Sequence, residues 1–146
     1  MNTKTLKCYT DGSKMGNRCG LGIVLLSDNK TTSLSQSHKI GDHCTIFQAE
    51  TLAISLSCNV INNYLDDNPT CPRIVNILTD SQSAFMALNN PVVKSETVLQ
   101  CIGNLNHLAL NTDVTISWIK AHNNYPGNEL ADEMAKKGLP SHASKT

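Results

Sequence analysis

The stretch LKCYTDGS, residues 6–13, is typical of a β-strand that runs into a turn at its Asp-Gly-Ser end. Two more strand-like runs follow closely, LGIVLLS at residues 21–27 and TSLSQSHKI at residues 32–40, and turn-forming Gly, Asn or Asp residues lie between them. Strands with such short connections pair antiparallel. The pattern therefore predicts an antiparallel meander.

Beyond Thr45 the hydrophobic period changes to that of a helix, and the sequence DDNPTCP ends this segment after Tyr64. Five apolar residues form the helical stripe: Ile46, Ala49, Ala53, Leu56 and Val60. We therefore expect a helix that packs through this stripe.

The second half of the chain alternates between strand and helix patterns. The β-branched run RIVNILT, residues 73–79, predicts a buried strand, and SQSAFMAL after it predicts a short helix. A longer helix is expected over residues 95–110, a strand over 114–120, and a final helix from about Asn128, a suitable N-cap, to Lys137. This order of elements implies an α/β fold in which helices pack on a mixed sheet.

The chain of 146 residues fits one domain, with a short polar tail over about residues 139–146 that we expect to be flexible. Twelve basic and twelve acidic residues cancel, so the chain lacks the basic field of many nucleic-acid-binding domains. The longest apolar run is far too short to cross a bilayer, and no secretory signal is visible. We expect an intracellular, soluble monomer of the cytoplasm or nucleus with no membrane partner.

Six cysteines are spread along the chain without a C-x-x-C pair or the spacing of zinc ligands. They are Cys8, Cys19, Cys44, Cys58, Cys71 and Cys101. In an intracellular protein this pattern predicts reduced thiols.

Four acidic residues occupy notable places in the predicted elements. Asp11 and Asp80 end the first and fourth strands, Glu50 lies on the apolar side of the first helix, and Asp132 opens the last helix. The carboxyl ends of neighbouring parallel strands are where open α/β sheets place their sites. Asp11 and Asp80 therefore converge if their strands are adjacent.

Each acid also has a purely structural interpretation. Asp11 fits a turn, Asp80 a helix start, and Asp132 a first-turn acid that complements the helix dipole. Glu50 is different, because residues 46–64 contain no other charged side chain and a lone carboxylate beside an apolar stripe needs a partner. If all four converge, their repulsion requires cations, and oxygen ligands favour Mg²⁺ or Mn²⁺ over zinc. Two such ions can clamp a phosphate between an attacking water and a leaving oxygen.

Four motifs in this order make the sequence resemble ribonuclease H type 1: YTDGS at residues 9–13, QAE at 48–50, LTDSQSA at 78–84 and HNNYPGNELADEMA at 122–135. The resemblance covers nearly the whole chain. The motifs are most similar in style to the ribonuclease H domains of non-long-terminal-repeat retrotransposons. The resemblance implies a five-stranded mixed sheet in the order 3-2-1-4-5 with helices on both faces. It also implies cleavage of the RNA strand of an RNA/DNA hybrid.

The resemblance further implies catalytic roles for five residues. Asp11 would bridge two Mg²⁺ ions, or Mn²⁺ as a substitute, with Glu50 and Asp80 on one side and Asp132 on the other. His122 matches a mobile-loop histidine that assists proton transfer or product release, although alone it also fits an exposed loop histidine. In this interpretation the Pro-Gly turn keeps the histidine loop flexible, while the helix start holds Asp132 on the metals.

The same resemblance suggests contacts with the nucleic acid. Ser13 and Gln82 match positions that meet the substrate in relatives, where the 2′-hydroxyl distinguishes RNA from DNA. Taken alone, both residues also suit a turn or a cap. Asn123 and Asn128 are further candidates for substrate binding.

Two departures from the family pattern affect substrate binding. Ile46 and Phe47 stand where cellular relatives often carry an Asn or Gln pair that grips the hybrid. Residues 81–110 contain one lysine, Lys94, and neither Arg nor Trp, so the basic, Trp-containing handle of some relatives is missing. We therefore expect weak, salt-sensitive binding by the isolated domain, with a fused or neighbouring reverse transcriptase supplying most of the affinity.

Two other functions are compatible with such a sheet. A transposase, integrase or resolvase also joins carboxylates to two metals but acts on DNA, and those families usually place the last acid differently and lack an acid like Glu50 together with a histidine loop like this one. A catalytically silent module would keep the fold for binding, but such modules lose their acids. The sequence, which retains four acids and the histidine, favours the nuclease.

Overall fold

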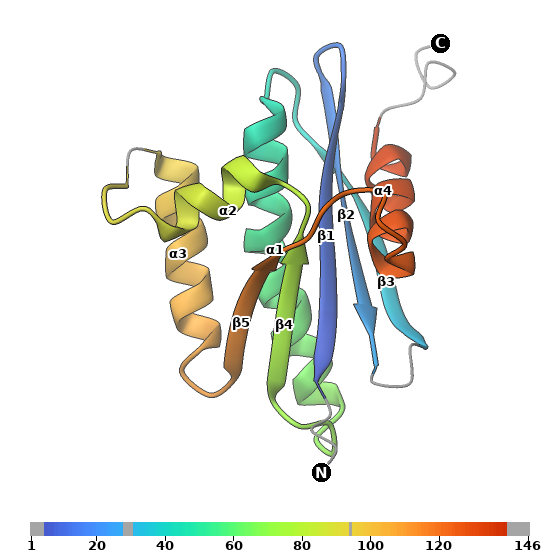
Figure 1. The fold of residues 1–146 in the computed structure, drawn as a ribbon, viewed down its shortest axis with the longest axis vertical. Coiled ribbons are helices and arrows are strands. Elements are labelled where there is room, and N and C mark those ends of the chain that lie inside the picture. The colour runs from blue at the N-terminus through green and yellow to red at the C-terminus, as the bar shows by residue number, and fades with distance from the viewer. Residues whose placement is uncertain (1–4, 28–30, 94, 140–146) are drawn as a thin grey trace.

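The structure is a computed structural model that describes residues 5–27, 31–93 and 95–139 (Figure 1). Five strands form one sheet: β1 (Leu6–Met15), β2 (Arg18–Leu26), β3 (Thr32–Ile40), β4 (Ile74–Thr79) and β5 (Asp113–Trp118). The helices within these ranges are α1 (Ile46–Asp67), α2 (Gln82–Asn89), α3 (Glu96–Leu108) and α4 (Pro126–Lys137). The predicted tail beyond Leu139 lies outside the described residues, as does Lys94.

The strand order is β3-β2-β1-β4-β5, as the sequence predicted. The first three strands form an antiparallel meander, whereas β1, β4 and β5 run parallel to one another. The pairing of β1 with β4 ends where Thr10 lies opposite Thr79. Asp11 and Asp80 are the next residues of the two strands, so the predicted adjacency of these positions is confirmed.

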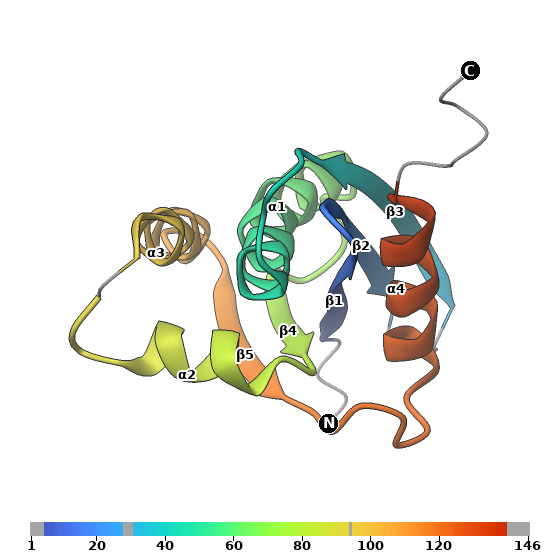
Figure 2. The same ribbon diagram turned by 90° about the horizontal axis from the view of Figure 1, so that it is seen from above.

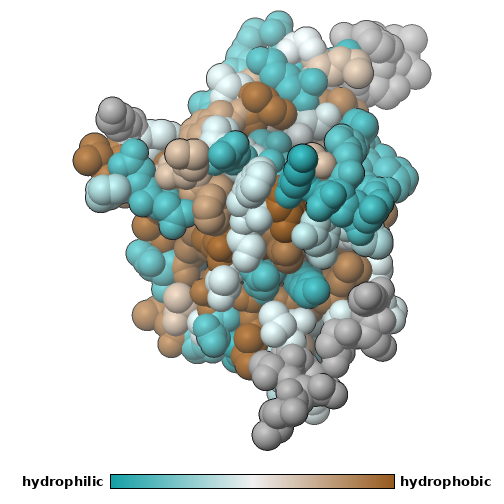
Figure 3. All heavy atoms as spheres, in the orientation of Figure 1, coloured by the Kyte–Doolittle hydropathy of each residue, from teal (hydrophilic) through white to brown (hydrophobic). Residues whose placement is uncertain are grey.

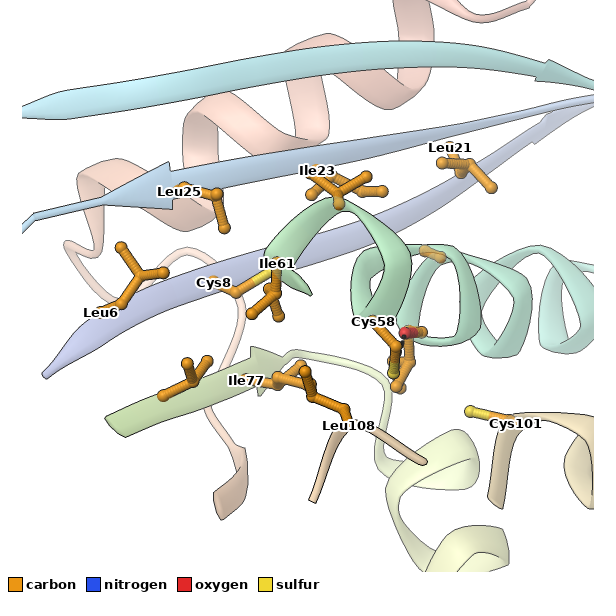
Figure 4. Close-up of a cluster of buried hydrophobic side chains, with 14 of the residues drawn as sticks. Leu6, Cys8, Leu21, Ile23, Leu25, Cys58, Ile61, Ile77, Cys101 and Leu108 are labelled. Carbon is orange, nitrogen blue, oxygen red and sulfur yellow. Dashed lines mark hydrogen bonds between the residues drawn. The ribbon is translucent and has the colours of Figure 1, made fainter. Parts of the chain in front are cut away.

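Helices cover both faces of the sheet (Figure 2). One face packs against α1, with α3 beyond it, and Figure 4 shows Ile23, Ile61 and Ile77 of β2, α1 and β4 pointing into the same core. The other face packs against α4 through a smaller cluster around Tyr9 and Val24. Each fully buried isoleucine contributes roughly 1.5–3 kcal/mol to stability, so these clusters hold the helices that carry the acids. No helix in the described ranges is long and apolar enough to cross a membrane.

The predicted turn at residues 11–13 is wrong, because β1 continues through it to Met15. Gly12 and its neighbours pair with β2, and the chain reverses later, where Met15 pairs with Arg18. Gly16 has a φ of 62°, the left-handed conformation that such a two-residue turn requires. The sequence correctly predicted a turn between the first two strands, but the turn lies four residues later, at Gly16 and not at Gly12.

The predicted stripe of the first helix is only partly right. Ala53 is fully buried as expected, but Ile46 is 47% exposed and Leu56 is half-buried. The large side chains in the core are Ile54 and Ile61 instead. The stripe is rotated because α1 contacts both the sheet and α3, so its buried arc is wider than one row of residues.

Cys19 and Cys44 form a disulfide, so the prediction that all six cysteines are reduced thiols is wrong. The antiparallel pairing of β2 with β3 places Cys19 opposite Ile40, and the chain that leaves β3 therefore returns to the start of β2. The backbone N–H of His43 also donates to the Asn17 carbonyl at 3.0 Å. The spacing of cysteines in the sequence gave no sign of this contact, because it arises from strand pairing. The other four cysteines make no disulfide.

Candidate active site

Asp11 and Glu50 meet where β1 passes the first turns of α1, and both side chains are buried. The backbone N–H of Gly12 donates to Glu50 Oε1 at 2.9 Å and to Asp11 Oδ1 at 3.0 Å. A Cβ at Gly12 would lie 2.7 Å from the backbone nitrogen of Glu50, so only glycine permits this approach. The Gly12 N–H is thus the partner of Glu50 that the sequence did not reveal.

Asp80 completes a compact group of three acids. One carboxylate oxygen from each of Asp11, Glu50 and Asp80 lies within 4.8 Å of the others. The indole N–H of Trp118, at the end of β5, donates to the Asp80 carbonyl at 3.2 Å. Trp118 therefore lies at the sheet edge and helps to fix the chain where it leaves β4.

Asp132 reaches the group from α4, on the opposite face of the sheet from α1. Its carboxylate shares a hydrogen bond with Asp11, and Lys136 binds it at 2.9 Å one helical turn away. Lys136 lies in the last turn of α4, and its ammonium pairs with this acid. The helix can come this close because Gly22 of β2 has no side chain. A Cβ at that position would overlap the backbone carbonyl of Ala131.

The environment of the acids shifts their protonation. Burial raises the pKa of Asp11 to about 10 and the pKa of Glu50 to about 8, and repulsion from the neighbouring carboxylates adds to both shifts. Burial also raises the pKa of Asp80, against a hydrogen bond from Asn128 that lowers it. For Asp132, burial is outweighed by hydrogen bonds to Lys136 and Asp11, so its pKa is lowered. Full ionisation of the cluster is therefore unfavourable unless a cation offsets the negative charge.

A pocket of about 420 Å³ lies beside the acids, between the end of β4 and the start of α4. Its lining residues are Asp80, His122, Asn128, Glu129, Asp132 and Glu133. His122 is exposed, with a left-handed φ of 57°, and its charge acts on Asp132. Hydrophilic side chains gather on this side of the molecule over α4 (Figure 3). The pocket thus brings the histidine and the acids together around a polar space.

The last helix begins at Pro126, so the predicted N-cap at Asn128 is wrong. The N-cap is Tyr125, which makes no side-chain capping bond, and proline suits the first helical position because its missing N–H is not needed there. Pro126 and Gly127 therefore belong to the first turn of α4 and are not the flexible turn that we expected after His122. Asn128 is buried instead, beside Asp80.

The other predicted substrate contacts lie near the cluster but are not part of it. Ser13 is half-buried on β1, two residues beyond Asp11, and Asn123 is exposed in the loop after His122. Gln82 is exposed at the start of α2, and the cap of that helix is Ser81, whose hydroxyl accepts from the Ala84 N–H at 3.2 Å. Gln82 is therefore not needed as a cap.

The positions at which the resemblance leads one to expect an Asn or Gln pair are occupied by apolar side chains. Ile46 is exposed, and Phe47 lines a separate hollow of about 180 Å³ together with Val92 and Val93. Neither side chain can donate a hydrogen bond to a base or a sugar. The replacement of the expected Asn or Gln pair by Ile46 and Phe47 therefore makes this part of the surface apolar.

A mixed sheet in this order, with acids gathered at the ends of its parallel strands, defines a nuclease-like α/β protein with a carboxylate site. The family model for RNase H matches residues 3–140, and the chain therefore belongs to the ribonuclease H family. It is 46% identical over 148 residues to a ribonuclease H of Polynucleobacter asymbioticus, covering 90% of this chain and 87% of that protein. These relations make the chain a ribonuclease H, a hydrolase.

Two solved structures share the fold. LC11-RNase H1 in complex with an RNA/DNA hybrid has a TM-score of 0.72 and 22% identity, and the match covers 91% of this chain and 98% of that one. The foamy viral protease-reverse transcriptase in complex with an RNA/DNA hybrid has a TM-score of 0.73 and 25% identity. That match covers 92% of this chain but 20% of the viral chain, so the fold also occurs within a longer protein.

We predict that, in EDTA, ionisation of the acid cluster destabilises the fold as the pH rises. Because folding raises the pKa of Glu50 and Asp11, their contribution is fully present below about pH 4 and is lost as the pH rises through about 8 and towards 10. Urea unfolding of the wild type and of Asp11→Asn between pH 4 and 9 isolates this contribution. The wild type should lose stability relative to the variant as the pH rises, and parallel curves would contradict the prediction.

Proposed function

We propose that the chain cleaves the RNA strand of RNA/DNA hybrids by hydrolysis that two divalent metal ions promote. The observation that carries the proposal is the group of oxygens from Asp11, Glu50 and Asp80 within 4.8 Å of one another, with Asp132 hydrogen-bonded to Asp11. LC11-RNase H1 and the viral reverse transcriptase, which share the fold, are both described as complexes with such a hybrid. The family and the site thus support the same substrate.

The donors of the site fit Mg²⁺, with Mn²⁺ as a substitute. All are carboxylate oxygens, and burial with mutual repulsion makes their full ionisation costly unless a cation binds. Asp11, Glu50, Asp80 and Asp132 would hold the ions. When bound, such ions supply an activated water and stabilise the leaving oxygen of a phosphodiester.

The remaining polar residues of the site suit the handling of protons and substrate. His122 is exposed and lines the same pocket as Asp80 and Asp132, so its imidazole would be placed to assist proton transfer or product release there. Ser13, Gln82 and Asn123 lie within two residues of an acid or of His122, where a nucleic acid bound at the pocket would meet them. The proposal gives these residues contacts with the sugar-phosphate backbone.

A larger assembly would explain how a weakly charged domain holds its substrate. The formal net charge is zero, and the surface at Ile46 and Phe47 is apolar, so the chain itself offers little attraction for phosphates. A reverse transcriptase, fused or neighbouring, would raise the local concentration of hybrid. The match to one fifth of the viral protease-reverse transcriptase supports this retroelement context. The nuclease domain itself would act as a monomer inside the cell, in the cytoplasm or nucleus.

The proposed reaction predicts metal-dependent cleavage of the hybrid alone. Labelled RNA/DNA, RNA/RNA and DNA/DNA duplexes should be incubated at low salt with Mg²⁺, Mn²⁺ or EDTA. We expect Asp80→Asn to lower the cleavage rate about a hundredfold or more, since metal-held charge stabilisation is worth several kcal/mol. Asp67→Asn, at an exposed acid that ends α1, is the matched control and should cut normally.

The three duplexes also separate the alternatives. Cleavage of DNA/DNA would favour the transposase-like nuclease. No cleavage of any duplex by a folded sample in either metal would contradict the proposal and favour a catalytically silent module.

The ion pair with Lys136 predicts a competition for Asp132. If Asp132 is a metal ligand, the ammonium 2.9 Å away repels the incoming ion and occupies one carboxylate oxygen. Lys136→Gln should then raise the Mg²⁺ affinity roughly two- to fivefold, the range of an exposed ion pair. Calorimetric titration without nucleic acid measures this, and Lys137→Gln is the control because Lys137 is an exposed neighbour on the same turn. Equal affinities in the two variants would remove Asp132 from the metal site.

A further inference from the structure

Asn128 occupies an unexpected position in the first turn of α4. Its side chain is 4% exposed, donates a hydrogen bond to the Asp80 carboxylate, and lines the pocket beside the acids. It does not cap the helix, because the N-cap is Tyr125. The Oδ1 atom of Asn128 is buried and has no hydrogen-bond partner in the part of the chain that the structure describes.

The orientation of this amide is fixed by its neighbour. An ionised carboxylate only accepts hydrogen bonds, so the NH₂ end of the amide must face Asp80 and the carbonyl end must point away. A buried acceptor without a donor destabilises the folded state, because it has lost its hydrogen bonds to water. The unsatisfied Oδ1 therefore counts against a purely stabilising role for Asn128.

The hydrogen bond also joins two parts of the site. Asp132 lies four residues after Asn128 on the same helix, so both side chains project from one face of α4. Asp132 contacts Asp11 at β1, and Asn128 contacts Asp80 at the end of β4. These two contacts tie the helix to both parallel strands where the acids converge.

We infer that Asn128 is a positioning residue that holds the Asp80 carboxylate, and with it the spacing between Asp80 and Asp132, in the arrangement that binds the metal ions. This inference rests on the proposed function, because it assigns those acids to a metal site. Asn128 acts through Asp80 and at a cost in stability. The role therefore differs from the substrate contact that the sequence suggested for Asn128.

The test replaces the amide with a side chain of similar size and no polar atoms. Asn128→Leu removes both the donor to Asp80 and the unsatisfied Oδ1, and Asn128→Ala serves as a second variant if leucine prevents folding. Three quantities are measured: the melting temperature in EDTA, the Mn²⁺ affinity by calorimetry without nucleic acid, and kcat and KM for the hybrid. Asn63→Ala, at an exposed position of α1, is the control.

We expect the melting temperature of Asn128→Leu in EDTA to stay the same or rise, while the Mn²⁺ affinity falls about tenfold, the loss typical of a residue that orients a metal ligand. The value of kcat should fall and KM should change little, because in the inferred role Asn128 acts on the Asp80 carboxylate and not on the nucleic acid. A large loss of melting temperature with unchanged Mn²⁺ affinity would overturn the inference and make Asn128 a packing residue. A rise in KM alone would overturn it in favour of substrate binding.

The readouts separate this inference from the proposed function. If the wild type cuts the hybrid and Asn128→Leu binds Mn²⁺ normally, the inference fails and the nuclease stands. If the wild type binds Mn²⁺ but cuts no duplex, the proposed function fails, and the Mn²⁺ affinity of the variant still decides the role of Asn128.

Discussion

The backbone N–H of Gly12 lies between two carboxylates, and the rest of the site depends on that contact. It donates to Asp11 of β1 and to Glu50 of α1, which brings a strand and a helix closer than any side chain would allow. Since α1 is anchored by the larger core, this contact fixes Glu50 relative to the sheet. Because the uncharged Gly12 N–H donates to both carboxylates, the two acids can lie side by side without a basic residue between them.

The fold holds the acids close together although their carboxylates repel one another. Burial and repulsion raise the pKa of Asp11 to about 10 and the pKa of Glu50 to about 8, so these two carboxyls favour the protonated form when no metal ion is bound. The cores on the two faces of the sheet keep α1 and α4 in place despite this repulsion. In the proposed function, a divalent ion bound at this site would relieve the repulsion that folding created.

The strand order was implied by the resemblance to ribonuclease H, and the approach of Asp11 and Asp80 was expected on condition that their strands are neighbours. Alternating residues gave β3 its correct bounds, and the parallel pairing of β1 with β4 brought Asp11 and Asp80 together. Two of the differences from the prediction concern contacts between distant segments. The Cys19–Cys44 disulfide arises from strand pairing, and the burial of Asn128 beside Asp80 arises from where α4 docks. No local pattern encodes such contacts.

The exact start of α4 and the exact position of the first turn were also not predictable from the sequence. Asn128 is a suitable N-cap by residue type, but Pro126 already has the φ of a first helical residue, and the helix starts there. The glycine of the predicted turn, Gly12, is needed for the approach of α1, and Gly16 makes the turn instead. A glycine in a sequence can indicate either a close approach of two backbones or a positive φ, and the residue type alone does not distinguish the two.

The most direct test of this account is the rate of hybrid cleavage by Gly12→Ala. The added Cβ would lie 2.7 Å from the backbone nitrogen of Glu50, so α1 must shift and Glu50 must leave the group of acids. Gly41→Ala is the matched control, because a Cβ at Gly41 meets nothing within 4 Å. The account predicts a folded Gly12→Ala protein with cleavage reduced about a hundredfold or more and normal cleavage by Gly41→Ala. Cleavage by Gly12→Ala at the wild-type rate would contradict it.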